Sequence, residues 1–233
     1  MPASPFTLRV EANGALLYDR RAHQYFPLSA AESFLLCAVQ EVPLKKALTH
    51  LTKAVGKKEA TATHEALRES GELDDDGRFT GRIIDTKQVA GAWGAPLVAH
   101  LGMTLACNFS CHHCYSSSGK RAADELTLPE IQTLIEQLAE MGCQKLVLGG
   151  GEPFLRSELP AVIRFADRFG IDCFVHTNGS KLSAKLLTEL AECPPAALAV
   201  SLDGADEASN DAIRGAHAFK RAMQGVELLE RHY

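Results

Sequence analysis

Apolar and polar residues alternate with a period of two in three short segments near the N-terminus, which predicts half-buried strands. Asn13-Gly14 is typical of a turn between the first two. Apolar positions then recur with a helical period, and the first such stretch opens with Ser29 and Glu32 in capping-box spacing. The predicted strands are 8–10, 15–18 and 24–28, and the predicted helices are 30–40, 43–54 and 58–70.

The sequence DDDG at 74–77 predicts a turn between two short polar strands. Three strands, three helices and a closing hairpin together are typical of a winged helix. We therefore expect a small winged-helix-like α+β domain over residues 1–80. Residues 81–96 are rich in Gly and Ala, and we expect them to form a linker.

From Leu97 the pattern changes to short apolar runs that alternate with helical stretches. Strands that alternate with helices form βα units around a parallel sheet, which predicts an α/β fold for residues 97–233. About four such units fit. The predicted strands are 97–105, 145–148, 171–176 and 196–202, and the predicted helices are 128–141, 157–169, 183–192, 207–213 and 219–231.

Composition narrows the classes of function. Hydrophobic residues make up 46% of the 233, and no run approaches the roughly 18 apolar residues of a membrane span. The N-terminus lacks the layout of a secretory signal, so we expect a cytoplasmic protein without a membrane partner. The formal net charge of -5, with no basic run to offset it, argues against nucleic acid as a partner.

Cys107, Cys111 and Cys114 form a CxxxCxxC motif just after the first predicted strand of the α/β region. Three thiolates on one loop can each bind a different iron of a cube-shaped cluster and leave the fourth iron open. The alternative is a structural zinc site in which His112 or His113 supplies a fourth ligand. The odd total of seven cysteines favours metal chemistry over disulfides. Four other cysteines are expected to be buried free thiols: Cys37, Cys143, Cys173 and Cys193.

The second predicted strand of this region ends in GGGEP at 149–153. Glycines there let the backbone approach a ligand closely, and the carboxylate of Glu152 can pair with an ammonium group. By itself the turn is equally compatible with a tight strand-to-helix connection. One βα unit after the cysteine loop, where βα folds place their active sites, it favours a binding site.

CxxxCxxC followed by GGEP resembles the radical S-adenosylmethionine (SAM) superfamily. Three further motifs follow in the same order as in that family: TNG at 177–179, SLDG at 201–204 and IRG at 213–215. The family's barrel has six βα units, so the resemblance implies a partial (β/α)6 barrel, apparently incomplete at its C-terminus.

The resemblance also implies the cofactors, a [4Fe–4S] cluster on the three cysteines and SAM on its fourth iron. An electron from reduced flavodoxin or ferredoxin would then yield a 5′-deoxyadenosyl radical, and no side chain is singled out as catalytic. The implied SAM-binding residues are Gly150, Gly151 and Glu152 for the amino group, Asn178, Ser201 and Asp203 for the ribose side, and Arg214 for the carboxylate. Without the family, a turn explains Asn178 and helix caps explain Ser201 and Asp203 equally well, and a surface role is the better explanation of Arg214.

The run CYSSSGK at 114–120 is similar to radical maturases of ribosomal peptides, notably the mycofactocin type, and to radical enzymes that modify haem precursors. Residues 14–36 resemble the peptide-binding domain of pyrroloquinoline quinone biosynthesis, which captures a leader peptide by strand addition. We therefore expect a peptide substrate with a leader segment. The alternatives are a haem-precursor enzyme, an inactive peptide-binding fragment and a zinc-dependent DNA-binding protein, the last disfavoured by the mixed charge of 58–70.

Overall fold

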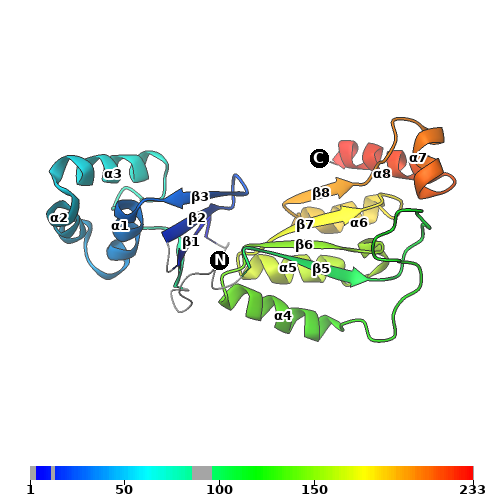
Figure 1. The fold of residues 1–233 in the computed structure, drawn as a ribbon, viewed down its shortest axis with the longest axis horizontal. Coiled ribbons are helices and arrows are strands. Elements are labelled where there is room, and N and C mark those ends of the chain that lie inside the picture. Colours follow the sequence, from blue (N-terminus) through cyan, green and yellow to red (C-terminus); the bar gives the residue numbers. More distant parts are fainter. Residues whose placement is uncertain (1–3, 12–13, 86–95, 233) are drawn as a thin grey trace. The chain divides into compact units, whose positions relative to one another are not determined.

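The computed structural model describes residues 4–11, 14–85 and 96–232. The chain forms two compact units, Met1–Pro96 with Glu140–Gln144, and Leu97–Ala139 with Lys145–Tyr233 (Figure 1). Asn13 of the expected turn and residues 86–95 of the expected linker lie outside the described residues.

A four-stranded sheet forms the frame of the first unit. The strands are β1 (Phe6–Glu11), β2 (Gly14–Asp19), β3 (Gln24–Leu28) and β4 (Arg82–Asp85). Their order in the sheet is β3-β2-β1-β4. Strand β2 pairs antiparallel with both β1 and β3, and β4 pairs parallel with β1. Strand β4 lies where a linker was expected. The expected hairpin is reduced to one isolated bridge between Leu73 and Phe79, after which the chain returns to pair with β1.

Three helices complete this unit, namely α1 (Ala30–Glu41), α2 (Leu44–Val55) and α3 (Lys57–Glu69). The capping box at α1 is present, because Glu32 N donates to Ser29 Oγ at 3.2 Å and Ser29 N donates to Glu32 Oε2 at 2.7 Å. One apolar core joins the sheet to the helices, and its most deeply buried members include Leu8, Leu17, Leu35, Leu36 and Leu51.

The second unit contains a parallel sheet in the order β5-β6-β7-β8, so the predicted α/β fold is confirmed. The strands are β5 (Val98–Thr104), β6 (Lys145–Gly150), β7 (Asp172–Thr177) and β8 (Ala197–Val200). The helical elements are α4 (Leu128–Glu140), the short η1 (Pro153–Leu155), α5 (Leu159–Arg168), α6 (Ala184–Ala191), α7 (Glu207–Arg214) and α8 (Ala218–His232). Four strands in sequence, each followed by a helix, make the partial barrel that was expected.

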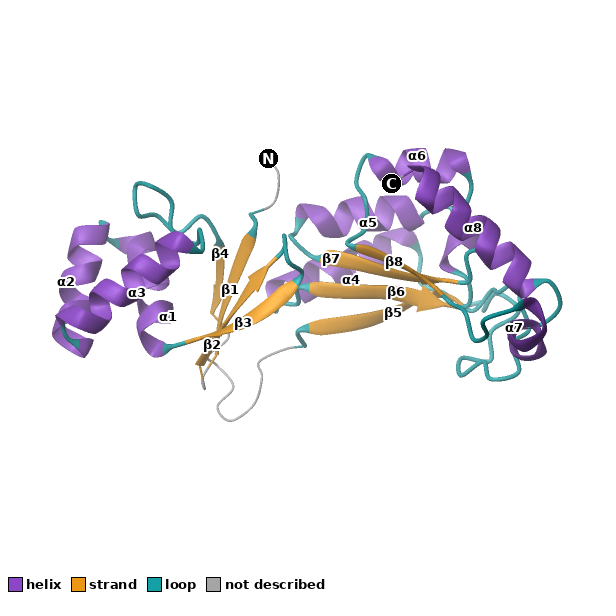
Figure 2. Cartoon of the chain, turned by 90° about the horizontal axis from the view of Figure 1, so that it is seen from above, coloured by secondary structure: helices purple, strands orange, loops and turns teal. Residues whose placement is uncertain are grey.

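Helices α4 and α5 lie along one face of this sheet (Figure 2). Side chains that point toward the helices are fully buried, as Leu146, Leu148 and Val175 are, whereas Val147 between them is only partly buried. All four strands run in the same direction, so the loops after them gather at a single edge of the sheet. That edge holds the residues singled out in the sequence. Among the described residues, no helix is long and apolar enough to cross a membrane.

Candidate functional site

A pocket of about 260 Å³ opens at the carboxyl edge of the parallel sheet. It is lined by loops that follow all four strands, and these loops lie far apart in the sequence. Most of the residues singled out in the sequence line it: Cys107, Cys111, Cys114, Gly150, Gly151, Asn178, Ser201 and Arg214. The fold therefore brings the three cysteines and the glycine-rich turn together around one space.

Glu152 does not line this pocket. Glu152 is fully buried. Its carboxylate accepts hydrogen bonds from Thr177 Oγ1 at 2.8 Å, Asn178 N at 2.8 Å and Phe154 N at 3.2 Å. Burial raises the pKa of Glu152, and the hydrogen bonds offset this only in part. The carboxylate thus ties the turn after β6 to the end of β7. Its contact with a methionine amino group stays a prediction.

Asp203 also lies outside the pocket lining, but its carboxylate lies close to two residues that line it. Its Oδ2 lies 2.5 Å from Arg214 Nε and 3.1 Å from His113 Nε2, and its backbone N donates to Asn210 Oδ1 at 2.9 Å. The Arg214 side chain is only 14% exposed. Asp203 therefore holds a guanidinium against the pocket, which a surface arginine would not require.

The cysteine loop is anchored to neighbouring loops as well as to itself. Cys107 N donates to Gly119 O at 3.0 Å, and Gly119 N donates back to Leu105 O at 2.8 Å. On the other side, His112 N donates to Ile213 O at 2.9 Å. These bonds fix both the start and the middle of the loop, because each joins backbone to backbone.

The three thiols of this loop are free and partly exposed. Cys114 Sγ lies 3.5 Å from Ser116 Oγ and accepts from Ser118 N at 3.3 Å, and these hydrogen bonds lower the pKa of Cys114. Burial raises the pKa of Cys111, although the nearby charge of Arg214 acts in the opposite direction. Hydrogen-bond donors aimed at the sulfur of Cys114 suit a thiolate that binds iron.

The sulfurs of Cys107, Cys111 and Cys114 do not form one compact group. Thiolates around a tetrahedral zinc ion lie about 3.8 Å apart, as follows from a zinc–sulfur bond of about 2.3 Å. Within the described part of the chain, one group of three or more His, Cys, Asp or Glu residues has all its ligand atoms within 4.8 Å of one another, and it does not include these cysteines. A cluster rather than zinc at these three cysteines stays a prediction.

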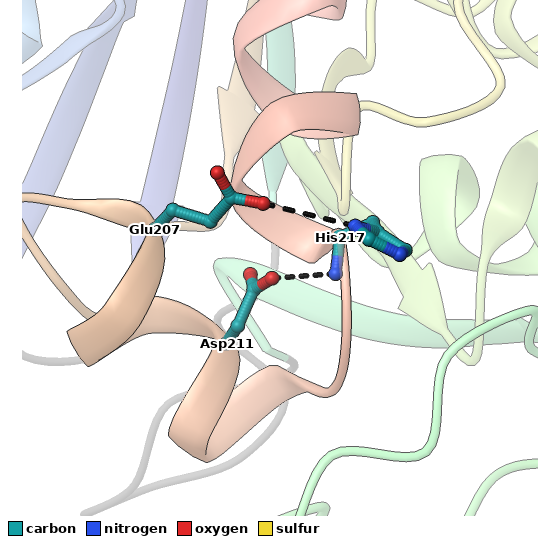
Figure 3. Close-up of side chains that lie close together, drawn as sticks. All are labelled: Glu207, Asp211 and His217. Atoms are coloured by element: carbon teal, nitrogen blue, oxygen red, sulfur yellow. Dashed lines mark hydrogen bonds and ion pairs between the residues drawn. The ribbon is translucent and has the colours of Figure 1, made fainter.

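That one compact group consists of Glu207, Asp211 and His217 (Figure 3). Asp211 accepts from His217 N at 2.5 Å and from Phe219 N at 2.8 Å, so its carboxylate caps the first turn of α8. Glu207 Oε1 lies 3.7 Å from His217 Nδ1, and both side chains are exposed. Helix capping explains the cluster, and we assign it no metal.

Two histidines that the sequence did not predict as site residues also line this pocket. His100 lies on β5 and His176 on β7, and each is exposed on the sheet face opposite the buried leucines and valines. His176 lies beside Gly149, where an added Cβ would be 4.0 Å from the His176 Cβ. The sequence held a signal for His176. Side chains alternate between the two faces of a strand, so His176 lies on the same side as Asn178, two residues later, and both line the pocket.

Residues 101–233 match the family model of the Radical SAM superfamily. The chain belongs to the radical SAM superfamily. Among curated relatives, a mycofactocin maturase MftC of Mycobacterium ulcerans is 36% identical over 135 residues, which is 58% of this chain and 37% of the relative. An AdoMet-dependent heme synthase of Methanosarcina barkeri is 33% identical over 139 residues, 59% of this chain and 40% of the relative. The aligned region thus spans well under half of these radical SAM relatives.

Among solved structures, SuiB of Streptococcus suis bound to its precursor peptide SuiA superposes with a TM-score of 0.67 at 16% identity. The match covers 98% of this chain and 55% of SuiB, so it includes both units. SuiB bound to S-adenosylmethionine gives a TM-score of 0.66 over the same share of this chain. At this identity the likeness establishes the fold, and the radical SAM family is established by the sequence match.

Proposed function

We propose that this radical SAM chain binds one [4Fe–4S] cluster through Cys107, Cys111 and Cys114 and binds SAM against it. Bound together, the cluster and SAM supply a 5′-deoxyadenosyl radical, which removes a hydrogen atom from a substrate. The observation that carries the proposal is the shared pocket, where three free thiols meet the glycine-rich turn and a held arginine.

The chain's own residues orient SAM in this proposal. Arg214, fixed by Asp203, offers a cation to the methionine carboxylate. Gly150 and Gly151 would offer backbone groups to the amino group. Gly151 packs closely against the start of the cysteine loop, and both glycines line the pocket with the three cysteines. Asn178 and Ser201 line the other side of the pocket, where we place the ribose.

We further propose that the substrate is a ribosomally made peptide whose leader binds to the first unit. Strand β3 lies at the edge of its sheet, with β2 as its partner in the described residues. An edge strand presents unpaired backbone groups that an extended peptide can pair with. Beside this backbone, Phe26 on β3 and Phe34 on α1 are each 42% exposed and offer apolar contacts. The names of the MftC relatives and the peptide bound to SuiB support this choice.

A haem precursor is the second candidate substrate, because several similar relatives are named as heme or Fe-coproporphyrin III synthases. Reduced flavodoxin or ferredoxin remains the proposed electron donor. A cytoplasmic location is part of the same proposal, since an iron–sulfur site of free thiols needs a reducing compartment.

The cofactor proposal is tested by anaerobic iron and sulfide analysis with an absorption spectrum, followed by detection of 5′-deoxyadenosine after reduction with dithionite. We expect about four irons and four sulfides per chain. Cys111→Ala should lose both the cluster and the product. Cys193→Ala is the matched control, because this thiol does not line the pocket. Zinc in place of iron, or iron content that is indifferent to Cys111, would contradict the proposal.

The substrate proposal is tested by comparing two additions to the reconstituted chain. A precursor peptide of the mycofactocin class should increase 5′-deoxyadenosine formation and gain a mass change, whereas Fe-coproporphyrin III should do neither. Phe26→Lys should weaken the response to the peptide while leaving peptide-free SAM cleavage unchanged. Stimulation by the porphyrin alone would favour the second candidate.

A further inference from the structure

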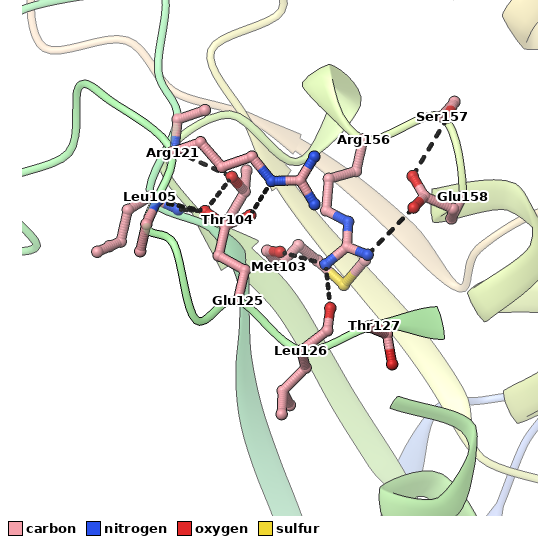
Figure 4. Close-up of polar contacts among 12 residues, drawn as sticks. Met103, Thr104, Leu105, Arg121, Glu125, Leu126, Thr127, Arg156, Ser157 and Glu158 are labelled. Carbon is pink, nitrogen blue, oxygen red and sulfur yellow. Dashed lines mark hydrogen bonds and ion pairs between the residues drawn. The ribbon is translucent and has the colours of Figure 1, made fainter. Parts of the chain in front are cut away.

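The loop between β5 and α4, residues 105–127, carries the three cysteines and returns to the point from which it leaves the sheet. Two charged side chains with little exposure lie at this base, Glu125 within the loop and Arg156 from the segment after η1 (Figure 4). Their side chains are 7% and 3% exposed. Neither residue belongs to a motif of the family resemblance, and neither lines the pocket.

Glu125 closes the base of the loop with one carboxylate oxygen. Its Oε1 accepts hydrogen bonds from Thr104 Oγ1 at 2.7 Å, from Leu105 N at 2.8 Å and from Ala122 N at 3.2 Å. Arg121 Nε lies 2.8 Å from the other oxygen. One side chain therefore joins the strand end before the cysteines to the segment after them.

Arg156 makes the same connection from a third segment. Its Nη1 donates to Met103 O at 3.1 Å and to Leu126 O at 2.8 Å, and its Nη2 donates to Glu158 Oε1 at 3.2 Å. Met103 precedes the loop and Leu126 follows Glu125. The base of the loop is thus held by two independent side chains of opposite charge.

The position of this base determines where the first cysteine lies. Cys107 is two residues beyond Leu105, whose backbone N is held by Glu125. Thr104 is a second donor to Glu125, and its carbonyl accepts a hydrogen bond from Gly151 N at 2.7 Å, so the glycine-rich turn is aligned on the same point. A shift at the base would move Cys107 relative to both the other thiols and the turn.

The Glu125 carboxylate is suited to hold several donors at once. The pKa of Glu125 lies below its ordinary value. Burial acts to raise this pKa, but the three hydrogen bonds to the carboxylate and the charge of Arg121 lower it by more. The group is therefore ionised at neutral pH and acts only as an acceptor. Removing it would leave the Leu105 and Ala122 backbone donors without this partner, which is costly where they are shielded from water.

We propose that Glu125 and Arg156 are positioning residues, which set the spacing of the three cysteines by closing the base of the loop. The inference rests on the proposed cluster, and it adds residues that act on the cluster through the loop without touching it. The spacing should influence how fully a cluster assembles on the three cysteines and how fast SAM is cleaved, because small displacements of reacting groups are expensive in rate.

The test compares Glu125→Ala, Glu125→Gln and Thr104→Val in the anaerobically reconstituted full chain. Three quantities are measured. They are the iron content per chain, the electron paramagnetic resonance (EPR) spectrum of the reduced cluster with and without SAM, and the kcat and the KM for SAM when SAM is cleaved without added peptide. We expect Glu125→Ala to lose more than half its iron and to lower kcat roughly ten- to hundredfold. Glu125→Gln keeps an acceptor oxygen and should recover iron uptake, with an intermediate kcat and an altered EPR spectrum.

Glu130→Ala is the matched control. Glu130 accepts from Thr127 N at 2.7 Å near the start of α4, so its removal costs stability one residue beyond the Leu126 carbonyl that Arg156 holds. It should lower the melting temperature while leaving iron content and the EPR spectrum unchanged. If Glu125→Ala does not fold, Thr104→Val decides, since it removes one donor to Glu125 and keeps the volume. It should alter the EPR spectrum and lower kcat with little change in KM.

A wild-type chain with a full cluster, together with Glu125→Ala or Thr104→Val variants of unchanged iron content, EPR spectrum and kcat, would overturn this inference alone. A wild-type chain that takes up no iron would overturn the proposed function and this inference with it. The two failures are therefore distinguishable in one set of preparations.

Discussion

The contact between the glycine-rich turn and the cysteine loop can be broken with one methyl group, by the substitution Gly151→Ala. A Cβ at Gly151 would lie 2.1 Å from Ala106 O and 2.7 Å from Ala106 C. These are backbone atoms, so no side-chain rotation can relieve the clash. The turn and the cysteine loop must move apart.

The cost follows from the bonds at this contact. Overpacking a well-packed site costs about 1–3 kcal/mol. Gly151 N donates to Thr104 O at 2.7 Å and Glu152 N donates to Ala106 O at 2.9 Å, and losing either bond costs about 1 kcal/mol. We therefore expect Gly151→Ala to lower the free energy of unfolding by about 2–5 kcal/mol and to reduce iron uptake.

Urea denaturation followed by circular dichroism measures the stability change, and anaerobic iron analysis measures the effect on the site. Gly119→Ala is the control, since it lies in the same loop and a Cβ there meets no atom within 4 Å. It should unfold like the wild type and bind iron normally. If Gly151→Ala matched Gly119→Ala in both measurements, the turn would not be packed against the cysteine loop as described.

Three further substitutions test the core, a helix cap and the site, and one pH series tests a buried carboxyl. Leu148→Ala, at a fully buried position of β6, should cost about 2–5 kcal/mol in urea denaturation. Asp211→Ala removes the cap of α8 and should lower the melting temperature without changing iron content. Asp203→Asn should raise the KM for SAM more than it lowers kcat, because Arg214 loses its fixed partner. Burial raises the pKa of Glu152 above its ordinary 4.5, so its contribution to stability is complete below pH 4.5 and is lost as the pH rises through the folded-state pKa. Denaturation as a function of pH should show this fall, and Glu152→Gln should flatten it.

Local patterns were enough to predict the order and type of most of the elements. The strand expected at 145–148 is β6 (Lys145–Gly150), and the helix expected at 128–141 is α4 (Leu128–Glu140). These signals are local because a period of two or of 3.6 residues is set by the backbone of the element itself. The cysteine spacing was also readable, since three ligands on one short loop need no long-range information.

Contacts between distant segments could not be read in this way. The sequence predicted a linker where β4 pairs with β1, and it gave no indication that the Glu152 carboxylate accepts hydrogen bonds from the end of β7. It gave no reason to connect Glu125 with Thr104, or to connect Arg156 with either end of the cysteine loop.

The sequence by itself determined the alternation of strands and helices, the cysteine motif and the family. The tertiary structure alone decided which side chains line the pocket and which contact the pocket-lining residues without lining it themselves. The physical reason is that a hydrogen bond between loops depends on the register of parallel strands that are separated by whole helices. Each element's own pattern leaves that register unspecified, and it is settled only when the strands pair and their buried faces pack.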